Sequence, residues 1–511
     1  MENLREFYLY TKNVLSPAET KKIELNLKYL GAGEQMLMEG FGSEIAKFLH
    51  HSYKSKRVLF ICGTGRKGAI GMVSARYFTN YANCELLLLS KRENLKNEVT
   101  KKSYALLDSL LNTYEIEEDN VMSVKKHIAD AEIIVDAIIG IGLKGRLSGF
   151  LTKAIKLIND SKKTVISIDL PSGINADNAL PNTASIKADI VLSIYKPLEA
   201  VLKLKDTKYI TLKTGLPIKA ELFAGPGDIY TALDQRSINA NKYSHGSVLI
   251  LSQNSNYAGA PFMAAHASNA ALAALYIGSG YVTILASKNS ISRFNNPLLI
   301  AKPLPEGDLG IEALNMIKNI KHNSFVIGPG FVDSDKDYNF IAKVVKDELA
   351  AGNTVIADSV AMKAASKKGI YGNIIMTPHE GEFKELTGID VSKLPFKERI
   401  YAAIEFAKEH KCTLVLKGNT TIITNGKLLK ISKADTPVLA TMGTGDVLSG
   451  IIAAFASIHK DAFEAAVAGV KLHSVIGDNL YNEKGLHITA SDVINGIPST
   501  LKAFDKINYV I

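Results

Sequence analysis

The chain lacks several features that define large protein classes. Its 511 residues contain no apolar run of the ~18–20 residues that a membrane-spanning helix needs, so no membrane association is expected. Only three cysteines are present, and they form no CxxC pair, which is typical of a reducing compartment and provides no paired-cysteine metal motif. The sequence MENLREFYLYTKN mixes charges of both signs without an apolar segment, so a secretory signal is not expected. We therefore expect a cytoplasmic protein.

Basic blocks are also absent. The net charge is +9, which could reflect the binding of nucleic acid or of a small anion such as a nucleotide. However, the lysines are spread along the chain, and no Lys/Arg run is interleaved with aromatic residues. We therefore expect no nucleic-acid partner, whereas a nucleotide ligand, which needs only a few cations, is compatible with the charge.

What the sequence does contain is an alternation of strand and helix patterns. Hydrophobic residues make up 47% and charged residues 22%, and the length predicts more than one globular domain. Short apolar runs such as RVLFICG (57–63) and SVLILSQ (247–253) alternate with helical patterns in both halves. Strands that are apolar throughout predict parallel sheets covered by helices on both faces, with sites beyond the carboxyl ends of the strands.

The alternation breaks in GLPIKAELFAGPGDIY (215–230), which has no clear period. We therefore predict two α/β domains joined by a linker. The predicted boundaries are 1–222 for a Rossmann-like three-layer domain, 223–235 for the linker and 236–511 for a second α/β domain. In the first domain, the loops expected to carry the site are 63–71, 136–142 and 169–173.

The stretch TMGTGDVLSG (441–450) places one acid, Asp446, among glycines before an apolar helix. In this arrangement the N–H groups of Thr444, Gly445 and Asp446 can point at an anion, and the helix dipole adds about half a positive charge. Glycines let the backbone approach a phosphate closely. The acid cannot itself bind phosphate, so it fits a base that acts on a hydroxyl beside the phosphate. The alternative is that Asp446 only caps the helix.

Further motifs follow the predicted strands of the second domain in a fixed order: GAP (259–261), GPGF (328–331), TPHEGEF (377–383), VLKGNTTII (415–423) and GTGD. This series resembles the ribokinase-like domain of ADP- or ATP-dependent NAD(P)H-hydrate dehydratases. The resemblance implies a ribokinase-like fold for the second domain. It also implies that Asp446 takes the proton of the hydroxyl at C6 of the hydrated nicotinamide ring, that this oxygen accepts a phosphoryl group, and that phosphate then leaves.

The same resemblance assigns contacts residue by residue. It implies that the hydrated nicotinamide nucleotide contacts Ala260, Gly330, His379 and Asp446. It implies that the adenine nucleotide, ADP or ATP with Mg²⁺, contacts Lys417, Gly418, Asn419, Thr420, Thr421, Gly443, Thr444 and Gly445.

The first domain resembles the NAD(P)H-hydrate epimerase that is fused to such dehydratases in bifunctional enzymes. The matching segments are QMLMEGFGSEIAKFL (35–49), AEIIVDAIIGIGLKGRLSG (131–149), IDLPSGINAD (168–177) and ADIVLSIYKP (188–197). The resemblance implies that Asp169 is the acid–base group, and that Asp136 and Ser172 hold a monovalent cation, potassium. It also implies substrate contacts by Gly140, Gly142, Lys144 and Arg146.

One segment of the first domain departs from this resemblance. The epimerases have GxGNNGGDG where this chain has GTGRKGAIG (63–71), so Arg66 and Lys67 replace two asparagines and Ile70 replaces an acid. The glycines that are kept can still form a backbone cradle for phosphate. Two hypotheses stay open: epimerase activity is lost and the domain is a scaffold, or the Lys67 ammonium occupies the position of the potassium ion. Ile70, which has no polar group, favours the first.

Other functions stay open as well. The second domain could be a kinase of the same superfamily that phosphorylates a small alcohol, since GTGD suits both reactions. The first domain could be a binding or scaffold module. The main prediction is a bifunctional enzyme that repairs hydrated NAD(P)H. Ala-rich helices in both halves could pack against copies of themselves, so a homo-oligomer is expected.

Overall fold

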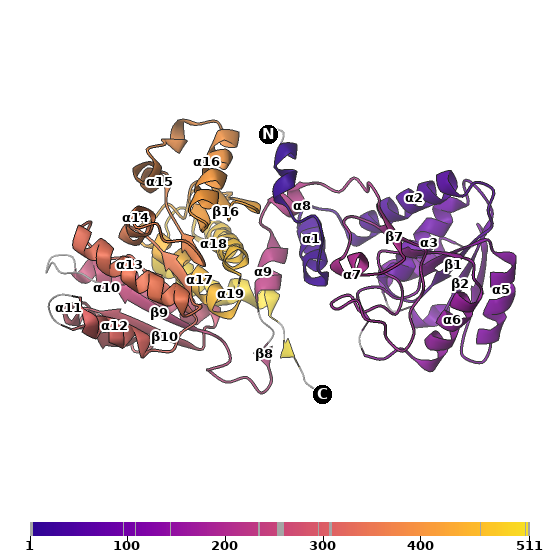
Figure 1. Cartoon of the computed structure of the whole chain (residues 1–511), viewed down its shortest axis with the longest axis horizontal. Coiled ribbons are helices and arrows are strands. Elements are labelled where there is room, and N and C mark those ends of the chain that lie inside the picture. Colours follow the sequence, from indigo (N-terminus) through magenta and orange to yellow (C-terminus); the bar gives the residue numbers. More distant parts are fainter. Residues whose placement is uncertain are drawn as a thin grey trace. The chain divides into compact units, whose positions relative to one another are not determined.

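The computed structural model shows two compact units (Figure 1). The first comprises Lys12–Pro217, and the second comprises Ile218–Ile511 together with the residues before Lys12. The predicted linker 223–235 includes a helix, α9 (Pro226–Ala232), whose Ile229 is buried in the core of the second unit. The described residues are 4–95, 97–107, 109–143, 145–233, 236–252, 260–294, 296–305, 309–459, 461–505 and 507–508, of which 260–265 and 507–508 are described by their backbone.

The first unit is built on a seven-stranded parallel sheet with the order β3-β2-β1-β4-β5-β6-β7. Its strands are β1 (Val58–Cys62), β2 (Cys84–Leu88), β3 (Asn112–Glu115), β4 (Ile133–Ala137), β5 (Thr164–Ile168), β6 (Ile190–Ser193) and β7 (Lys208–Thr211). The strand order reverses between β1 and β4, so the loops that follow these two strands meet at the carboxyl edge of the sheet. The edge strands β3 and β7 are more exposed and lack an apolar run, so the sequence pattern did not predict them.

Helices cover this first sheet. They are α1 (Pro17–Tyr29), α2 (Glu34–Ser52), α3 (Arg66–Phe78), α4 (Glu98–Ala105), α5 (Val124–Asp130), α6 (Gly149–Asp160) and α7 (Glu199–Leu202), with short 3₁₀ turns at Arg92–Asn94 and Val121–Ser123. Helix α3 begins directly after the glycine loop that follows β1. It packs closely on α2, because a Cβ atom added to Gly42 would lie 2.5 Å from Cγ1 of Val73. The predicted Rossmann-like α/β fold of this unit is confirmed.

The second unit is built on a nine-stranded sheet with the order β11-β10-β9-β12-β13-β14-β15-β16-β17. Its strands are β9 (Ser247–Ser252), β10 (Tyr281–Ala286), β11 (Ile300–Pro303), β12 (Ser324–Ile327), β13 (Thr354–Ala357), β14 (Ile374–Met376), β15 (Thr413–Leu416), β16 (Thr420–Thr424) and β17 (Leu429–Lys433), and β8 (Arg236–Ser237) pairs separately with β18 (Ile507–Asn508). Strands β11 to β15 are parallel, whereas β16 and β17 join antiparallel. The order reverses between β9 and β12, which places a second carboxyl-edge site there.

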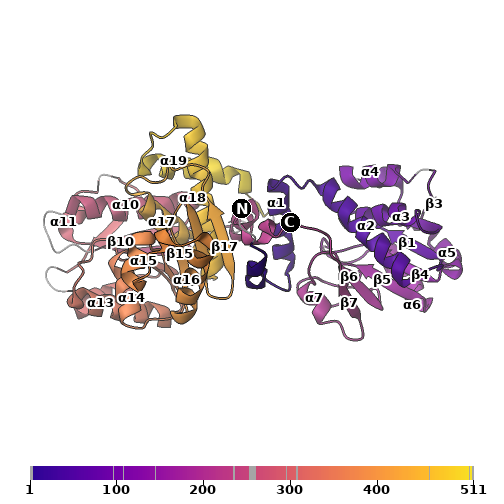
Figure 2. The same cartoon turned by 90° about the horizontal axis from the view of Figure 1, so that it is seen from above.

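Helices cover both faces of the second sheet, which gives three layers (Figure 2). One face packs against α9, α10 (Ala260–Ile277), α17 (Thr444–Ile458), α18 (Ala462–Lys484) and α19 (Ala490–Leu501). The other packs against α12 (Ile311–Lys318), α13 (Asp335–Ala350), α14 (Val360–Lys367), α15 (Glu380–Thr387) and α16 (Phe396–Glu409). Shorter helices are α8 (Lys219–Leu222), α11 (Lys288–Ile291) and the 3₁₀ turns Arg5–Tyr10, Val391–Lys393 and Lys502–Phe504. Successive residues of β9, such as Ile250 and Leu251, enter the cores on opposite faces of the sheet. This explains why the strand is apolar throughout, as predicted.

The Ala-rich helix α10 is buried inside its own unit. A Cβ atom added to Gly450 of α17 would lie 2.1 Å from the backbone oxygen of Ala270, so the two helices touch along their small residues. The described alanines of α10, from Ala267 to Ala274, are buried and do not provide the self-association surface that we expected. The homo-oligomer stays a prediction. Among the residues that the structure describes, no helix has the length and apolar character needed to cross a membrane.

Candidate functional site

The start of α17 forms a helix N-terminus with unused donors. Gly443 is the N-cap residue in a left-handed conformation (φ 87°), and no side chain caps the helix. Within the described residues, the N–H groups of Gly445 and Asp446 have no hydrogen-bond partner, whereas Thr444 N–H already donates to the oxygen of Thr441 at 3.3 Å. The predicted anion cradle is therefore formed by two N–H groups rather than three, at the positive end of a 15-residue helix.

Asp446 does not cap α17. It lies inside the first turn, is 6% exposed, and pairs through Oδ2 with Nδ1 of His266 on α10. The helix-cap alternative is thus wrong, because the carboxylate faces another helix. No motif points to His266, although an imidazole in a segment of small and apolar residues is a signal of a buried polar contact.

A cation with one long ion pair lies beside this N-terminus. Lys417 follows β15, and its Nζ lies 3.6 Å from Oδ1 of Asp358, which follows β13. The other oxygen of Asp358 accepts a hydrogen bond from Ser449 Oγ of α17 at 3.2 Å. A Cβ atom added to Gly445 would lie 3.8 Å from Nζ of Lys417. The ammonium and the unused N–H groups therefore converge, and the long distance to Asp358 leaves the ammonium able to bind an incoming anion.

A cavity of about 720 Å³ opens next to these groups. Seven residues predicted from the sequence line it: His379, Lys417, Gly418, Asn419, Thr421, Thr444 and Gly445. Residues that the sequence analysis did not predict also line it, among them Asp435, Thr436, Pro437, Val470 and His473. They lie in the loop after β17 and on α18, and no local motif marks them. The cavity has the size of a small-molecule site.

The remaining predicted residues of the second unit lie at or just beyond the ends of strands and helices. Thr420 begins β16 and Gly443 precedes Thr444, so both are chain neighbours of residues that line the cavity. Gly330 follows β12 and has a left-handed conformation with φ 90°. Ala260 is the first residue of α10, and its side chain lies outside the described residues.

His379 has a structural role in addition to its place at the cavity. It is the N-cap of α15, and its Nδ1 accepts hydrogen bonds from the N–H groups of Gly381 and Glu382, each at 3.1 Å. Lys417 N–H donates to the oxygen of Pro378 at 2.8 Å, so this capped turn is tied to the end of β15. The capped turn therefore holds His379 and Lys417 next to each other.

His473 on α18 is a buried neutral group in the cavity wall. Burial lowers the pKa of its imidazole to about 4; a backbone hydrogen bond at Thr444 opposes this effect, and the charge of Lys417 adds to it. Its Nε2 has no hydrogen-bond partner in the described part of the chain. The imidazole is therefore uncharged at neutral pH and leaves one nitrogen unpaired.

The second site lies where β1 and β4 end in the first unit. Glycines bring α3 against these strands: a Cβ atom added to Gly63 would lie 2.1 Å from the oxygen of Ile138, and one added to Gly68 would lie 1.9 Å from the oxygen of Gly63. The glycine loop is thus required by packing, whatever ligand it binds. Arg66 at its end is held by Glu24 at 2.5 Å and Glu34 at 2.6 Å.

Lys67 extends from this loop into the protein interior. Its Nζ donates to Oδ2 of Asp136 at 2.9 Å and to Oγ of Ser172 at 3.1 Å. Backbone oxygens of Leu170 and Ile139 lie at 2.7 Å and 3.4 Å. Burial lowers the pKa of Lys67, and the Asp136 carboxylate opposes this effect. The two residues expected to hold a cation are therefore both bound to an ammonium group of the chain itself.

Asp169, the predicted acid–base residue, directly precedes Leu170 in the same loop. Its backbone is left-handed, with φ 61°, which is a strained conformation for an aspartate. Desolvation raises the pKa of its carboxyl to about 6; the Lys67 ammonium lowers it, and Glu24 raises it. A pKa near neutrality suits a group that must both take and return a proton.

The residues predicted to contact the substrate in the first site range from packed to exposed. A Cβ atom added to Gly140 would lie 3.5 Å from Cδ of Lys67, so this glycine packs over the lysine stem. Gly142 and Arg146 are exposed in the loop before α6, and Lys144 lies outside the described residues. Ile70 is buried on α3 and takes no part in the hydrogen bonds of Lys67.

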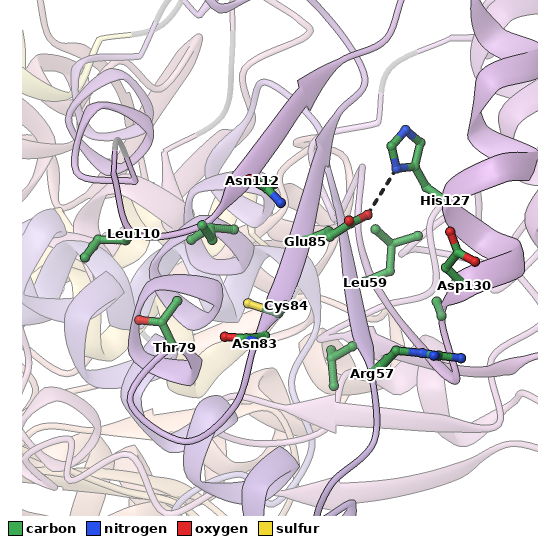
Figure 3. Close-up of a pocket in the computed structure, with 13 residues that line it drawn as sticks. Arg57, Leu59, Thr79, Asn83, Cys84, Glu85, Leu110, Asn112, His127 and Asp130 are labelled. Atoms are coloured by element: carbon green, nitrogen blue, oxygen red, sulfur yellow. Dashed lines mark hydrogen bonds and ion pairs between the residues drawn. The ribbon is translucent and has the colours of Figure 1, made fainter.

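A further hollow of about 390 Å³ lies at the opposite, amino edge of the first sheet (Figure 3). It is lined by residues at the starts of β1, β2 and β3, and His127 pairs there with Glu85 at 3.1 Å. Since ligand sites of such sheets lie at the carboxyl edge, we do not assign it to either active site. In the described ranges, no group of three or more His, Cys, Asp and Glu side chains is arranged to hold a metal ion.

Comparisons with known proteins match both units of the chain. The NAD(P)H-hydrate dehydratase family model matches residues 248–499, and the model of the YjeF-related protein N-terminus matches residues 34–200. The bifunctional NAD(P)H-hydrate repair enzyme Nnr of Methanopyrus kandleri is 30% identical over 497 residues, which cover 96% of each chain. The corresponding enzyme of Methanocaldococcus jannaschii is 30% identical over 512 residues, which cover 96% of this chain and 94% of that one.

A solved structure is also similar. The ADP/ATP-dependent NAD(P)H-hydrate dehydratase of Bacillus subtilis, co-crystallised with ATP and Mg²⁺, is 26% identical, covers 56% of this chain and 99% of its own, and has a TM-score of 0.47. The sequence relatives extend over both units and contain both matched segments in one chain. This chain therefore belongs to the family of bifunctional NAD(P)H-hydrate repair enzymes.

Proposed function

We propose that the chain repairs hydrated NAD(P)H with one reaction in each unit. The second unit uses ADP or ATP to dehydrate the S form of the hydrate, and the first unit interconverts the R and S forms. The observation that carries the dehydratase assignment is the buried Asp446 carboxylate beside two free N–H groups and a nucleotide-sized cavity. Membership in the family supports both reactions.

The groups of the second unit fit a nucleotide with its phosphates toward α17. The cavity, which is lined by His379 and Val470, receives the adenosine part, and Gly445 is also among its lining residues. Lys417 and the helix N-terminus then bind the terminal phosphate. Mg²⁺ normally keeps several waters and binds through one or two carboxylates and the phosphates. Two carboxylates lie near these groups, Asp358 beside Lys417 and Asp435 in the cavity wall, and we assign the ion to Asp358. Bound there, it would neutralise phosphate charge.

Asp446 acts on the substrate hydroxyl. Water added at C6 of the ring leaves a hydroxyl, which is a poor leaving group. Asp446 takes its proton, the oxygen attacks the terminal phosphorus, and the bond from that phosphorus to the nucleotide breaks. The ring nitrogen lone pair then expels the phosphorylated oxygen as phosphate, and loss of a ring proton restores NAD(P)H. His266 fixes the orientation of the Asp446 carboxylate.

In the first unit, Asp169 is the acid–base group for the interconversion. Its pKa of about 6 allows it to accept a proton at neutral pH and to return it. The oxygens that would have held potassium are already bound to Lys67, so no step of this reaction is assigned to a metal.

The decisive experiment measures recovery of reduced nicotinamide. The full-length protein is incubated with the S hydrate, Mg²⁺ and either ADP or ATP, and the near-ultraviolet absorbance of NAD(P)H is followed together with free phosphate. We expect equal amounts of both products, and a rate loss of ~10²–10⁴-fold in Asp446→Asn. Normal turnover by Asp446→Asn would contradict the proposed role.

The same assay separates the reaction from that of a small-alcohol kinase. A kinase would produce a stable phosphorylated alcohol and no free phosphate. A dehydratase produces free phosphate and NAD(P)H from the hydrate. The absence of NAD(P)H with both nucleotides would refute the dehydratase assignment.

A further inference from the structure

The buried ammonium of Lys67 is held in the manner of a bound cation. Lys67 is 7% exposed, and its partner Asp136 is 0% exposed. One carboxylate, one hydroxyl and two backbone carbonyls surround Nζ. Oxygen groups of this kind are the ligands that hard metal cations prefer. The environment is thus a cation site that is filled by a side chain.

The hydrogen bonds show that Nζ acts as a donor beside a carboxylate. Carbonyl oxygens can only accept, so Nζ must donate to Leu170. The carboxylate of Asp136 accepts from Ser167 Oγ at 2.8 Å, from Ser172 N–H at 2.9 Å and from Ile138 N–H at 3.1 Å. Several donors stabilise the ionised form of a buried carboxylate. Its negative charge then requires a positive partner in the same place, and Lys67 is the positive group within hydrogen-bond distance.

A metal ion does not fit beside this group. The two residues expected to bind potassium, Asp136 and Ser172, both lie within 3.1 Å of Nζ. A monovalent ion bound to the same oxygens would overlap the nitrogen and would add a second positive charge. These contacts argue against the potassium site that the sequence resemblance implied for the first unit.

We propose that Lys67 is a built-in cation that takes the place of a bound monovalent metal in the first unit. It joins the first turn of α3 to the loops after β4 and β5 and fixes Leu170, the residue that follows Asp169. Lys67 is in this sense a positioning residue for Asp169. The consequence, which rests on the epimerase reaction proposed above, is that the first unit works without potassium.

The first test is structural and needs no activity. Crystals of the full-length wild-type protein are soaked in rubidium chloride, and anomalous scattering is measured at Asp136 and Ser172. We expect no rubidium there in the wild type, and a rubidium ion in Lys67→Asn, which shortens the side chain and opens the site. Rubidium between these two residues in the wild type would overturn the proposal.

Thermal unfolding provides an independent measurement. We expect that replacing tetramethylammonium chloride by potassium chloride raises the melting temperature of Lys67→Asn and leaves that of the wild type unchanged. Lys67→Met, which fills the space without a charge, should gain nothing from potassium. Arg66→Asn is the matched control. Arg66 is the residue before Lys67, but its charge pairs with Glu24 and Glu34 and not with Asp136, so this variant should behave as the wild type. A potassium-dependent rise in the wild type would refute the proposal.

The kinetic test compares conversion of the R hydrate to the S hydrate in the two salts. The wild type should show equal rates, and Lys67→Asn should lose ~10–100-fold without potassium and recover when potassium is added. A wild-type rate that depends on potassium contradicts the built-in cation. A wild type that is inactive in both salts, yet binds no rubidium, instead refutes the epimerase assignment while the cation assignment stands.

Discussion

Protonation of His473 should destabilise the second unit in mild acid. The folded pKa of about 4 lies below the ordinary value of 6.5, so the unfolded chain binds more protons between these pH values. The contribution of His473 to the free energy of unfolding is therefore fully present above pH 6.5 and is lost as the pH drops toward 4. The two pKa values differ by about 2.5, and each whole step in pKa corresponds to about 1.36 kcal/mol, so the full loss is about 3 kcal/mol. Since the imidazole is 8% exposed, solvent screening does not reduce this value appreciably.

The assay is urea unfolding of the nucleotide-free protein at several pH values. The chain has no tryptophan, so the transition is followed by circular dichroism. His473→Gln should remove the part of the pH dependence that lies between pH 6.5 and 4, whereas His487→Gln, which alters an exposed histidine, should keep it. If His473→Gln and the wild type lose stability in parallel over this range, the argument from burial is refuted.

Three further substitutions test the second unit. His266→Asn should lower the turnover number of the dehydratase by up to about 10²-fold by releasing Asp446, with the Michaelis constant for nucleotide unchanged. Lys417→Met should instead raise the Michaelis constant for ADP or ATP by ~10–100-fold, because a hydrogen bond to a charged group contributes about 1.5–3 kcal/mol; equal constants would exclude a phosphate contact. Gly450→Ala should lower the melting temperature by an amount equivalent to about 1–3 kcal/mol, since its Cβ would lie 2.1 Å from the Ala270 oxygen. Gly445→Ala in the same helix meets only an ordinary contact, at 3.8 Å, and should not melt earlier.

Much of the fold follows from the sequence because buried parallel strands are continuous apolar runs. The runs that became β1, β4 and β9 could be recognised without any partner. Strands β3 and β7 could not, because edge strands face solvent and their pairing is set by the neighbouring strand. Helix α9 was missed because the Gly225–Pro226 pair resembles a turn, although Pro226 is the first residue of the helix, a position that favours proline.

The site residues were predicted from local sequence motifs. Contacts between residues far apart in the chain do not appear in such motifs and were missed. Asp446 stood out from its glycines, but its partner His266 lies 180 positions away in the chain. The position of the Lys67 ammonium was one of two hypotheses, and its contacts join residues 69 to 105 positions apart. Such contacts are fixed by the strand order, which brings the loops after β1, β4 and β5 to one edge.

The two units use lysine in opposite ways. Both lysines lie at the carboxyl edge of a parallel sheet and beside a carboxylate. The Lys67 ammonium lies 2.9 Å from Asp136 and is nearly inaccessible, so its charge is neutralised by the protein and can only position neighbouring groups. The Lys417 ammonium lies 3.6 Å from Asp358 with 22% of its side chain exposed, so it can move toward a phosphate. The binding of an anionic substrate should therefore depend on ionic strength through Lys417, whereas the contribution of Lys67 should not, because added salt screens exposed charges far more than buried ones.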